Sequence, residues 1–285
     1  MADDSAGQPQ RPKLKAPPGA CDCHMHFYGP RRRFSYRADA PNAPPPASVD
    51  DYRAVRARLG LARTVVVQPS VYGTDNTCNL EAMAELGAEA RGVMVVDTEV
   101  SDAELARLTG LGVCGERFYM LGGVLGWDIL DEMAARVHDF GWHVQLQLDG
   151  RELGEREAAL RRLPGTLVID HVGRFGEPVG VDHPGFRALM RLVEGGRCWV
   201  KLSMPYDGSR VGPPNYDDVG VLAKALVRAA PERMLWASNW PHPTVPVSER
   251  PDDAVLLDVL LDWVGDDATR HRILVDNPAD LYGFD

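Results

Sequence analysis

Two histidines separated by a single residue are the first feature of the sequence that could support chemistry. His24 and His26 lie in the segment CDCHMH, whose small and apolar residues indicate a β-strand. Alternate residues of a strand point to the same face, so we expect the two imidazoles to project together, with Cys23 and Met25 on the opposite face. Two neighbouring imidazoles can bind a metal ion or polarise a carbonyl oxygen. The alternative interpretation is an accidental pair of surface histidines.

A third histidine and two arginines end or follow other apolar segments. His171 ends the segment at 166–171, Arg174 follows it in IDHVGR, and Arg117 lies in GERF near the end of the segment at 113–119. An arginine at the end of a buried strand requires an acidic neighbour or an anionic ligand, because an unpaired buried charge is costly. Arg174 could hold a carboxylate through two parallel hydrogen bonds, although a surface ion pair is the simpler interpretation of this residue alone.

Three further polar residues follow apolar segments. Ser70 ends the sequence QPS and could donate a hydrogen bond to a substrate oxygen, but no GxSxG surrounds it, so we do not interpret it as a nucleophile. Asn239 and His242 lie in SNWPHP, whose prolines are expected to hold a rigid loop. Asn239 stands where a general base would be most useful, and an amide cannot accept a proton.

The elements that must position these residues are short apolar segments alternating with helix-like patterns. Nearly continuous apolar character is typical of strands buried on both faces of a parallel sheet. Eight such units predict a (β/α)8 barrel, or TIM barrel, in which active residues lie at the carboxyl ends of the strands. An open doubly wound sheet is the alternative, and no GxGxxG follows the first segment to support its dinucleotide-binding form. The predicted strands are residues 21–26, 64–68, 92–97, 113–119, 143–148, 166–171, 198–203 and 234–238.

Predicted helices occupy the stretches between these strands. Ser101 and Glu104 have the spacing of a capping box, in which two side chains bond the backbone at a helix start. We predict a flexible N-terminal tail over residues 1–18, a single barrel domain over residues 19–285, and an extended proline-rich loop at 41–46. The predicted helices begin after Ser48, Thr77 and Ser101 and otherwise cover 127–140, 151–162, 184–194, 217–230 and 252–264.

Composition excludes several classes of function. The chain has 285 residues, 31 Lys and Arg against 41 Asp and Glu, and a net charge of -10, so binding to nucleic acid or to an anionic membrane surface is not expected. No apolar stretch approaches the roughly 18 residues that a membrane span needs, and the polar N-terminus resembles no secretory signal. Five cysteines without a CxxC favour reduced thiols. We therefore expect a cytoplasmic protein with a small-molecule partner; the sequence predicts no oligomeric state.

Seven blocks in order resemble the amidohydrolase-type (β/α)8 superfamily. Within it they are most similar to the branch of 2-pyrone-4,6-dicarboxylate lactonase and related sugar-lactone hydrolases and isomerases. The resemblance spans about residues 15 to 283 and implies opening of a lactone ring by water. It implies that His24, His26 and His171 surround the lactone carbonyl, and that Ser70, Arg117 and Arg174 hold polar and carboxylate groups of the substrate. The blocks are PPGACDCHMHFYGP, VVVQPSVYGTDN, RGVMVVD, GERF, GWHV, IDHVGR and WASNWPHP.

The chain departs from the lactonase pattern at four places. Asn239 replaces the Asp that activates water, Gln147 replaces a Tyr and is therefore a candidate substrate contact, and Gly123 replaces a second Arg. The segment at 204–210 does not align with a loop that supplies another Arg. Fewer cationic contacts imply a substrate with fewer carboxylates. Our hypothesis is that His26 or His242 serves as the base and that Asn239 orients the water.

The same resemblance leaves the metal open, because the pyrone lactonase works without a divalent metal while other members use one or two. A binuclear site would need a histidine late in the fifth strand, where the sequence has Gln145 and Gln147; His143 begins that strand. We predict no cofactor. The alternative is one zinc ion bound by His24, His26 and His171, which would supply the hydroxide that the missing Asp cannot.

The combined prediction is a hydrolase that opens a carboxylated lactone, either 2-pyrone-dicarboxylate-like or derived from a sugar acid, in aromatic or sugar-acid catabolism. Two alternatives remain. One is a lactone isomerase, which would move an acyl group between hydroxyls without water. The other is a barrel that lost its catalytic Asp at position 239 and serves as a binding protein.

Overall fold

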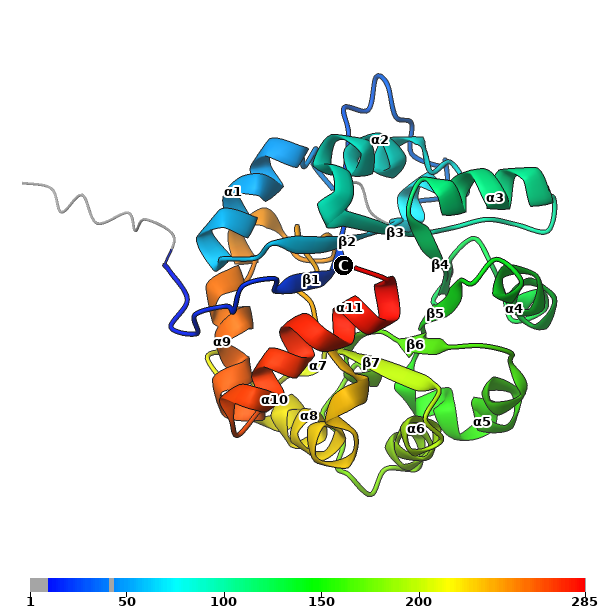
Figure 1. The fold of residues 1–285 in the computed structure, drawn as a ribbon. Helices are drawn as coiled ribbons and strands as arrows, with labels where there is room; N and C mark the ends of the chain where they lie inside the picture. Colours follow the sequence, from blue (N-terminus) through cyan, green and yellow to red (C-terminus); the bar gives the residue numbers. More distant parts are fainter. Residues whose placement is uncertain (1–9, 41–43, 285) are drawn as a thin grey trace, which may run out of the picture.

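The computed structural model, which describes residues 10–40 and 44–284, confirms the predicted (β/α)8 barrel (Figure 1). Eight parallel strands pair in sequence order, each with its neighbours in the chain. All eight predicted strands are present, with ends that differ by a few residues. The strands are β1 (Cys21–Met25), β2 (Arg63–Val67), β3 (Ala90–Met94), β4 (Val113–Tyr119), β5 (His143–Gln147), β6 (Leu167–Ile169), β7 (Cys198–Leu202) and β8 (Met234–Trp236).

Two hydrogen bonds join the carboxyl end of β1 to the residues that follow β8 and so close the barrel. The amide nitrogen of Asn239 donates to the carbonyl oxygen of His24 at 2.9 Å, and that of His26 donates to the carbonyl of Trp240 at 2.8 Å. This seam brings the first and last predicted site segments side by side.

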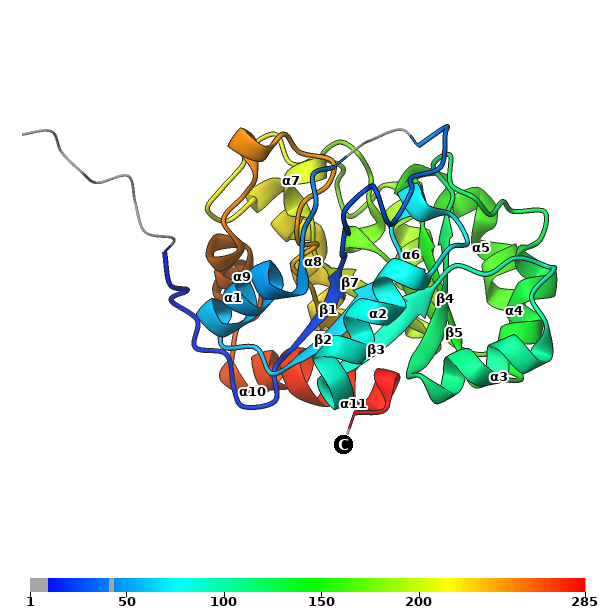
Figure 2. The same ribbon diagram turned by 90° about the horizontal axis from the view of Figure 1, so that it is seen from above.

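Helices surround the strands on the outside of the barrel (Figure 1). Figure 2 shows α7 at one end of the barrel and α11 at the other. The helices are α1 (Val49–Leu59), α2 (Thr77–Leu86), α3 (Asp102–Gly110), α4 (Leu130–His138), α5 (Leu153–Arg162), α6 (Pro184–Glu194), α7 (Pro205–Gly208), α8 (Asp217–Ala229), α9 (Asp253–Trp263), α10 (Asp267–His271) and α11 (Asn277–Tyr282).

Local sequence explains where several helices begin and end. Ser48 and Asp51 form a reciprocal capping box at the start of α1, and Gly60 ends that helix with a φ of 75° that glycine adopts without steric cost. The Ser101 hydroxyl accepts from the Glu104 amide, as the spacing predicts. The prediction missed α7, α10 and α11, which have at most six residues each and are too short for a helical period to stand out.

Two apolar clusters form the core. The larger one fills the space between the sheet and the helices. The smaller one fills the inside of the barrel below its carboxyl end and includes Tyr282 of α11 and Phe284, so the C-terminal segment covers the amino-terminal end of the strands. The smaller cluster contains Cys21, Cys23, Val65, Val67, Val93, Val168, Trp199, Leu235, Ala237, Tyr282 and Phe284.

An irregularity in β1 corrects the expectation that Cys23 points toward the helices. From Asp22 to Met25 the strand advances three residues while β2 advances two, from Thr64 to Val66. A bulge of this kind interrupts strict alternation. Cys23 therefore packs inside the barrel, although His24 next to it also faces the interior.

Residues near the N-terminus contact the barrel. Leu14 is buried, and the backbone amides of Lys13 and Leu14 donate to the Asp258 carboxylate on α9. Residues 1–9 of the predicted tail and 41–43 of the predicted proline-rich loop lie outside the described residues. The five cysteines form no disulfide in the described structure. In the described part of the chain, the helices are too short or too polar to cross a membrane.

Glu116 of β4 is an unusual buried carboxyl. It points away from the barrel interior that Arg117 faces, is fully buried, and neither carboxyl oxygen has a hydrogen-bond partner among the described residues. Burial raises the pKa of this carboxyl well above its ordinary value. The folded state therefore favours the protonated form.

Replacing this carboxyl is expected to change how stability depends on pH. Because the folded-state pKa is raised, this carboxyl does not lower the free energy of unfolding below about pH 4.5. Its destabilising contribution grows as the pH rises toward and through the folded-state pKa. Glu116→Met should therefore raise the free energy of unfolding at pH 7 by about 1–3 kcal/mol, the usual cost of a buried unpaired polar group, and flatten its pH dependence. Urea unfolding of the variant and the wild-type chain at pH 5 and pH 8 measures this. The exposed Glu132→Met on α4 is the control, and equal slopes in all three proteins would refute the expectation.

Candidate active site

A cavity of about 490 Å³ opens at the carboxyl end of the barrel. Its described lining contains no acidic side chain. Tyr28, Tyr119 and Met204 supply its less polar surface. Of the nine residues predicted for the site, six line this cavity: His26, Ser70, Arg117, Gln147, His171 and Asn239.

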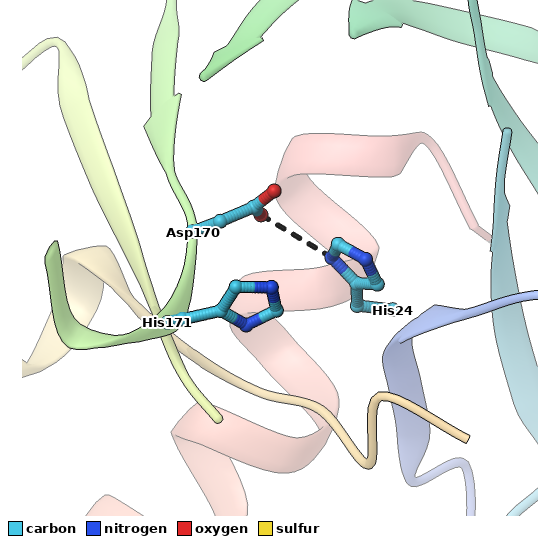
Figure 3. A group of neighbouring side chains, drawn as sticks. All are labelled: His24, Asp170 and His171. Atoms are coloured by element: carbon cyan, nitrogen blue, oxygen red, sulfur yellow. Dashed lines mark hydrogen bonds and ion pairs between the residues drawn. The ribbon is translucent and has the colours of Figure 1, made fainter. Parts of the chain in front are cut away.

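The three predicted imidazoles converge at the base of this cavity. The ring centre of His24 lies 4.8 Å from that of His26 and 4.9 Å from that of His171. Figure 3 shows His24, from β1, and His171, from the turn after β6, approaching one another, with Asp170 reaching the His24 ring. His24 itself is fully buried behind His26.

Hydrogen bonds determine which nitrogen of His26 carries the proton. Its Nδ1 lies 2.7 Å from the carbonyl oxygen of Val67, which can only accept, so Nδ1 donates. Burial and the nearby Arg117 lower the pKa of His26 to about 3, so the ring is neutral at pH 7 and Nε2 carries a lone pair. His24 Nε2 lies 3.2 Å from this atom and His24 Nδ1 lies 3.2 Å from Asp170 Oδ1, so a neutral His24 ring can donate to only one of these two acceptors.

A buried polar group lies behind His24. Its Nδ1 is 3.2 Å from Asp170 Oδ1 and 3.4 Å from both Gln145 Nε2 and Lys201 Nζ. Lys201 donates to Gln145 Oε1 at 2.6 Å and lies 3.7 Å from the Asp170 carboxylate. Burial lowers the pKa of Lys201, while Asp170 favours its charged form. Neutral imidazoles are thus flanked by Lys201 and Arg117, with one carboxylate between them.

The nitrogen donors could hold a metal ion, but the neighbouring charges oppose one. Donor atoms of His24, Asp170 and His171 lie within 4.8 Å of one another. The Nε2 atoms of His24 and His26 are 3.2 Å apart. Two nitrogen ligands of one tetrahedral zinc ion are separated by roughly 3.3 Å, which is close to this distance. Lys201 and Arg117 place two cations beside these donors, and Asp170 is the carboxylate in contact with Lys201 and His24. The distances between the donor atoms therefore suit a divalent cation, but repulsion from Lys201 and Arg117 disfavours its binding.

Arg117 lines the cavity and has no acidic partner among the described residues. Its Nη1 donates to the carbonyl of Gln68 at 2.8 Å and its Nη2 to Gln147 Oε1 at 2.5 Å. Nε has no hydrogen-bond partner among the described residues. A buried guanidinium held by neutral acceptors keeps its full charge available to an anion in the cavity.

Arg174 lies in an adjoining hollow of about 360 Å³ rather than in the main cavity. Its Nε is 3.1 Å from Asp207 Oδ2, which gives the ion pair that the sequence offered as the simpler interpretation. His171 lines both hollows. A substrate carboxylate would have to compete with Asp207 for this guanidinium.

Asn239 and His242 belong to one hydrogen-bonded chain. Asn239 Nδ2 donates to the Tyr206 hydroxyl at 2.8 Å, and His242 Nδ1 lies 3.0 Å from the same hydroxyl. His242 Nε2 lies 3.0 Å from Asp253 Oδ1 on α9. Both ring nitrogens of His242 are thus engaged, and this ring does not line the cavity.

Strained backbone concentrates in the loops after β6, β7 and β8. A positive φ is uncommon outside glycine and is most costly for a β-branched residue such as Val172, whose φ is 54°. Strain of this kind gathers at sites whose geometry the surrounding structure imposes. The described non-glycine residues with positive φ are His171, Val172, Arg174, Met204, Tyr216, Asn239 and His242.

Sequence reasoning missed four side chains that support the site. Lys201 carried a usable signal, because a lone charge in the apolar segment CWVKLS must be paired if that segment is buried. Asp170 directly precedes His171 and could have been considered with it. Tyr206 and Asp253 carried no such signal, since their contacts join a short loop helix to the start of α9.

Nearly the whole chain is similar to known proteins. A family model described as Amidohydrolase matches residues 21–284. The 2-pyrone-4,6-dicarboxylate hydrolase of Comamonas testosteroni is 36% identical over 290 residues, covering 98% of this chain and 95% of that protein. The D-galactarolactone isomerase of Agrobacterium fabrum is 34% identical over 275 residues, covering 95% and 93%. A crystal structure from Agrobacterium tumefaciens, solved in the apo form, superposes with a TM-score of 0.88 at 33% identity, covering 96% and 99%.

Proposed function

The chain belongs to the amidohydrolase family, and from this premise we propose that it is an enzyme that opens the ring of a carboxylated lactone by water attack. One observation carries the proposal. The cavity holds two imidazoles, one buried guanidinium and no acidic side chain among its described lining residues, so it favours an oxyanion or a carboxylate. Membership of an enzyme family argues against the alternative of a barrel that only binds a ligand.

Stabilisation of the carbonyl oxygen is assigned to Arg117 and His171. Both line the cavity, and both are buried, so hydrogen bonds to a developing negative charge are strong there. The Ser203 hydroxyl, 2.8 Å from His171 Nδ1, orients this ring and leaves Nε2 as its other hydrogen-bonding atom. Removal of one such donor typically costs about 10²–10³-fold in rate.

Activation of water is assigned to His26. Its Nδ1 is committed to Val67, so Nε2 accepts the proton of water in the tautomer in which His24 carries its own proton on Nδ1, toward Asp170. Asn239 lines the same cavity and would orient that water, while Ser70 and Gln147 contact polar groups of the substrate. His242 stays behind Tyr206 in this mechanism and does not touch the water.

We propose that the enzyme works without a metal. If zinc bound, His24, His26 and His171 would hold it, and it would supply a polarised water. The cationic side chains of Lys201 and Arg117 disfavour that state. We therefore expect substoichiometric zinc in protein purified without chelator and no loss of activity when chelator is added. Elemental analysis of the purified chain is the measurement, and one zinc ion per chain would overturn the metal-free mechanism.

A panel of γ- and δ-lactones, with and without carboxylate substituents, tests the function. Hydrolysis releases a proton, which a pH indicator detects, and adds the mass of one water molecule to the product. We expect carboxylated lactones to react fastest because of the guanidinium in the cavity. Absence of turnover across the whole panel would reject the proposal.

Isomerisation is the second candidate, and Asn239 favours it. A hydroxyl of the substrate held beside the carbonyl reaches an effective concentration of about 10⁵–10⁸ M and can attack with less help from a base. The cavity offers an amide and not a carboxylate at this position. Mass spectrometry in ¹⁸O-labelled water distinguishes the two reactions, because isomerisation incorporates no label and leaves the mass unchanged.

A further inference from the structure

A buried chain of hydrogen bonds connects α9 to the cavity through three loop side chains. It runs from the Asp253 carboxylate to His242, then to the Tyr206 hydroxyl, and ends at Asn239. We propose that Asp253, acting through His242 and Tyr206, holds the Asn239 amide with its carbonyl oxygen toward the cavity. The directions of these hydrogen bonds do not depend on the proposed function. The consequence for substrates rests on the proposed function.

The direction of every bond follows from the carboxylate. The Asp253 carboxylate can only accept, so His242 Nε2 donates, and with its single proton on Nε2 the ring has its lone pair on Nδ1. Nδ1 accepts the proton of the Tyr206 hydroxyl, whose oxygen in turn accepts from Asn239 Nδ2. The amide nitrogen is thereby committed to Tyr206. The free end of the amide is Oδ1, an acceptor.

Surrounding contacts hold both ends of this chain. Arg58 on α1 places Nη2 3.4 Å from Asp253 Oδ2, so the second oxygen of this carboxylate also has a partner. Burial raises the pKa of Tyr206, so its hydroxyl keeps the proton that it donates. Asp253, His242 and Asn239 are buried and Tyr206 is partly exposed, so water is excluded most fully from the bond between Asp253 and His242.

An acceptor at this place in the cavity selects for a donor on the ligand. A lactone with a free hydroxyl next to the reacting carbonyl, as in lactones of sugar acids, can donate to Oδ1. An unsaturated lactone without hydroxyls would leave Oδ1 unpaired unless water fills the space. The inferred substrate class is therefore a hydroxylated lactone.

The inference also predicts that positions 239 and 253 depend on each other. In Asn239→Asp, the new carboxylate requires the Tyr206 proton, so Tyr206 must accept from His242 Nδ1. His242 Nε2 would then present a lone pair to Asp253 unless the ring becomes charged. Asp253→Asn removes that conflict because its amide can donate to Nε2. Asp253→Asn should therefore lower the stability of the wild-type protein and raise the stability of the Asn239→Asp variant.

Thermal unfolding of the four proteins of this cycle tests the chain of bonds without any assay of activity. We expect each single substitution to lower the melting temperature by several degrees and the double variant to recover most of the loss. Asp262→Asn on the same helix, where Asp262 pairs with Lys224, is the matched control and should have the same small effect in both backgrounds. Additive effects of Asp253→Asn and Asn239→Asp would overturn the proposal.

Turnover of a hydroxylated and a hydroxyl-free lactone tests which atom faces the ligand. Asp253→Asn should lower kcat/KM for the hydroxylated lactone about tenfold, the loss of one hydrogen bond, and should affect the hydroxyl-free lactone less. In the Asn239→Asp background the same substitution should raise kcat/KM. An equal loss on both lactones, or a loss in both backgrounds, would refute the inference. If no lactone reacts, the proposed function fails, and the unfolding cycle still decides the orientation of Asn239.

Discussion

His26→Asn is expected to lower kcat for lactone opening by about 10²–10⁴-fold, the usual contribution of a general base. The substituted side chain can still donate to the Val67 carbonyl, so the local backbone should be retained. It carries no basic lone pair toward the cavity. Initial rates measured with the fastest lactone of the panel give the size of the loss.

A second histidine provides the control for this substitution. His143 is about as deeply buried as His26 but lies at the opposite end of the barrel, where its ring makes an edge-to-face contact with Tyr282 at 5.5 Å. His143→Asn should retain kcat to within a few fold in protein that remains folded. Comparable losses in both variants would mean that barrel stability, and not base catalysis, accounts for the effect.

The pH dependence of the wild-type enzyme bears on the same base. His26 is active when neutral, and burial lowers its pKa to about 3. Activity should therefore persist as the pH falls through the ordinary histidine range and decline only near pH 3. An acid limb near pH 6.5 would assign the base to a less buried group.

Arg117→Met is expected to lower kcat/KM for a carboxylated lactone by about 10²–10³-fold. The substitution retains an unbranched apolar stem and removes the one guanidinium among the described residues that line the cavity. The carbonyls of Gln68 and the Gln147 side chain would also lose their donor. Arg117→Lys should recover only part of the loss, because an ammonium cannot donate to both acceptors and a substrate in the same plane.

Arg174→Met separates the two arginines that the sequence offered as substrate contacts. Arg174 pairs with Asp207 in the adjoining hollow, so its loss should change kcat/KM by less than about tenfold. Steady-state kinetics of both variants on the same lactone decide the assignment. A larger effect at Arg174 than at Arg117 would move the carboxylate site to the adjoining hollow.

The barrel and its three imidazoles could be predicted because their signals are local. Continuous apolar segments mark strands that are buried on both faces, and the polar residues at their carboxyl ends then share one edge of the barrel. His24 and His171 are separated by more than half of the sequence, yet this rule alone places them together, and their rings lie 4.9 Å apart.

The supporting layer could not be predicted to the same extent. The positions of Tyr206 and Asp253 depend on loops whose backbone is strained and on the packing of α9, neither of which has a period in sequence. Cys23 was assigned to the wrong face because a bulge in β1 has no signature in CDCHMH. The sequence also could not show that Arg174 forms an ion pair with Asp207.

The seam between β1 and β8 has a consequence for how activity appears during folding. His24 and His26 lie on one side of it and Asn239 on the other, joined by two backbone hydrogen bonds. These are among the contacts with the longest sequence separation in the molecule, and such contacts are costly to form early because of the entropy of closing a long loop. A barrel that has not closed at this seam would thus hold the two imidazoles without Asn239 beside them. After dilution from denaturant, catalytic activity should therefore return only when the barrel closes. This return should be later than the recovery of the helical circular-dichroism signal.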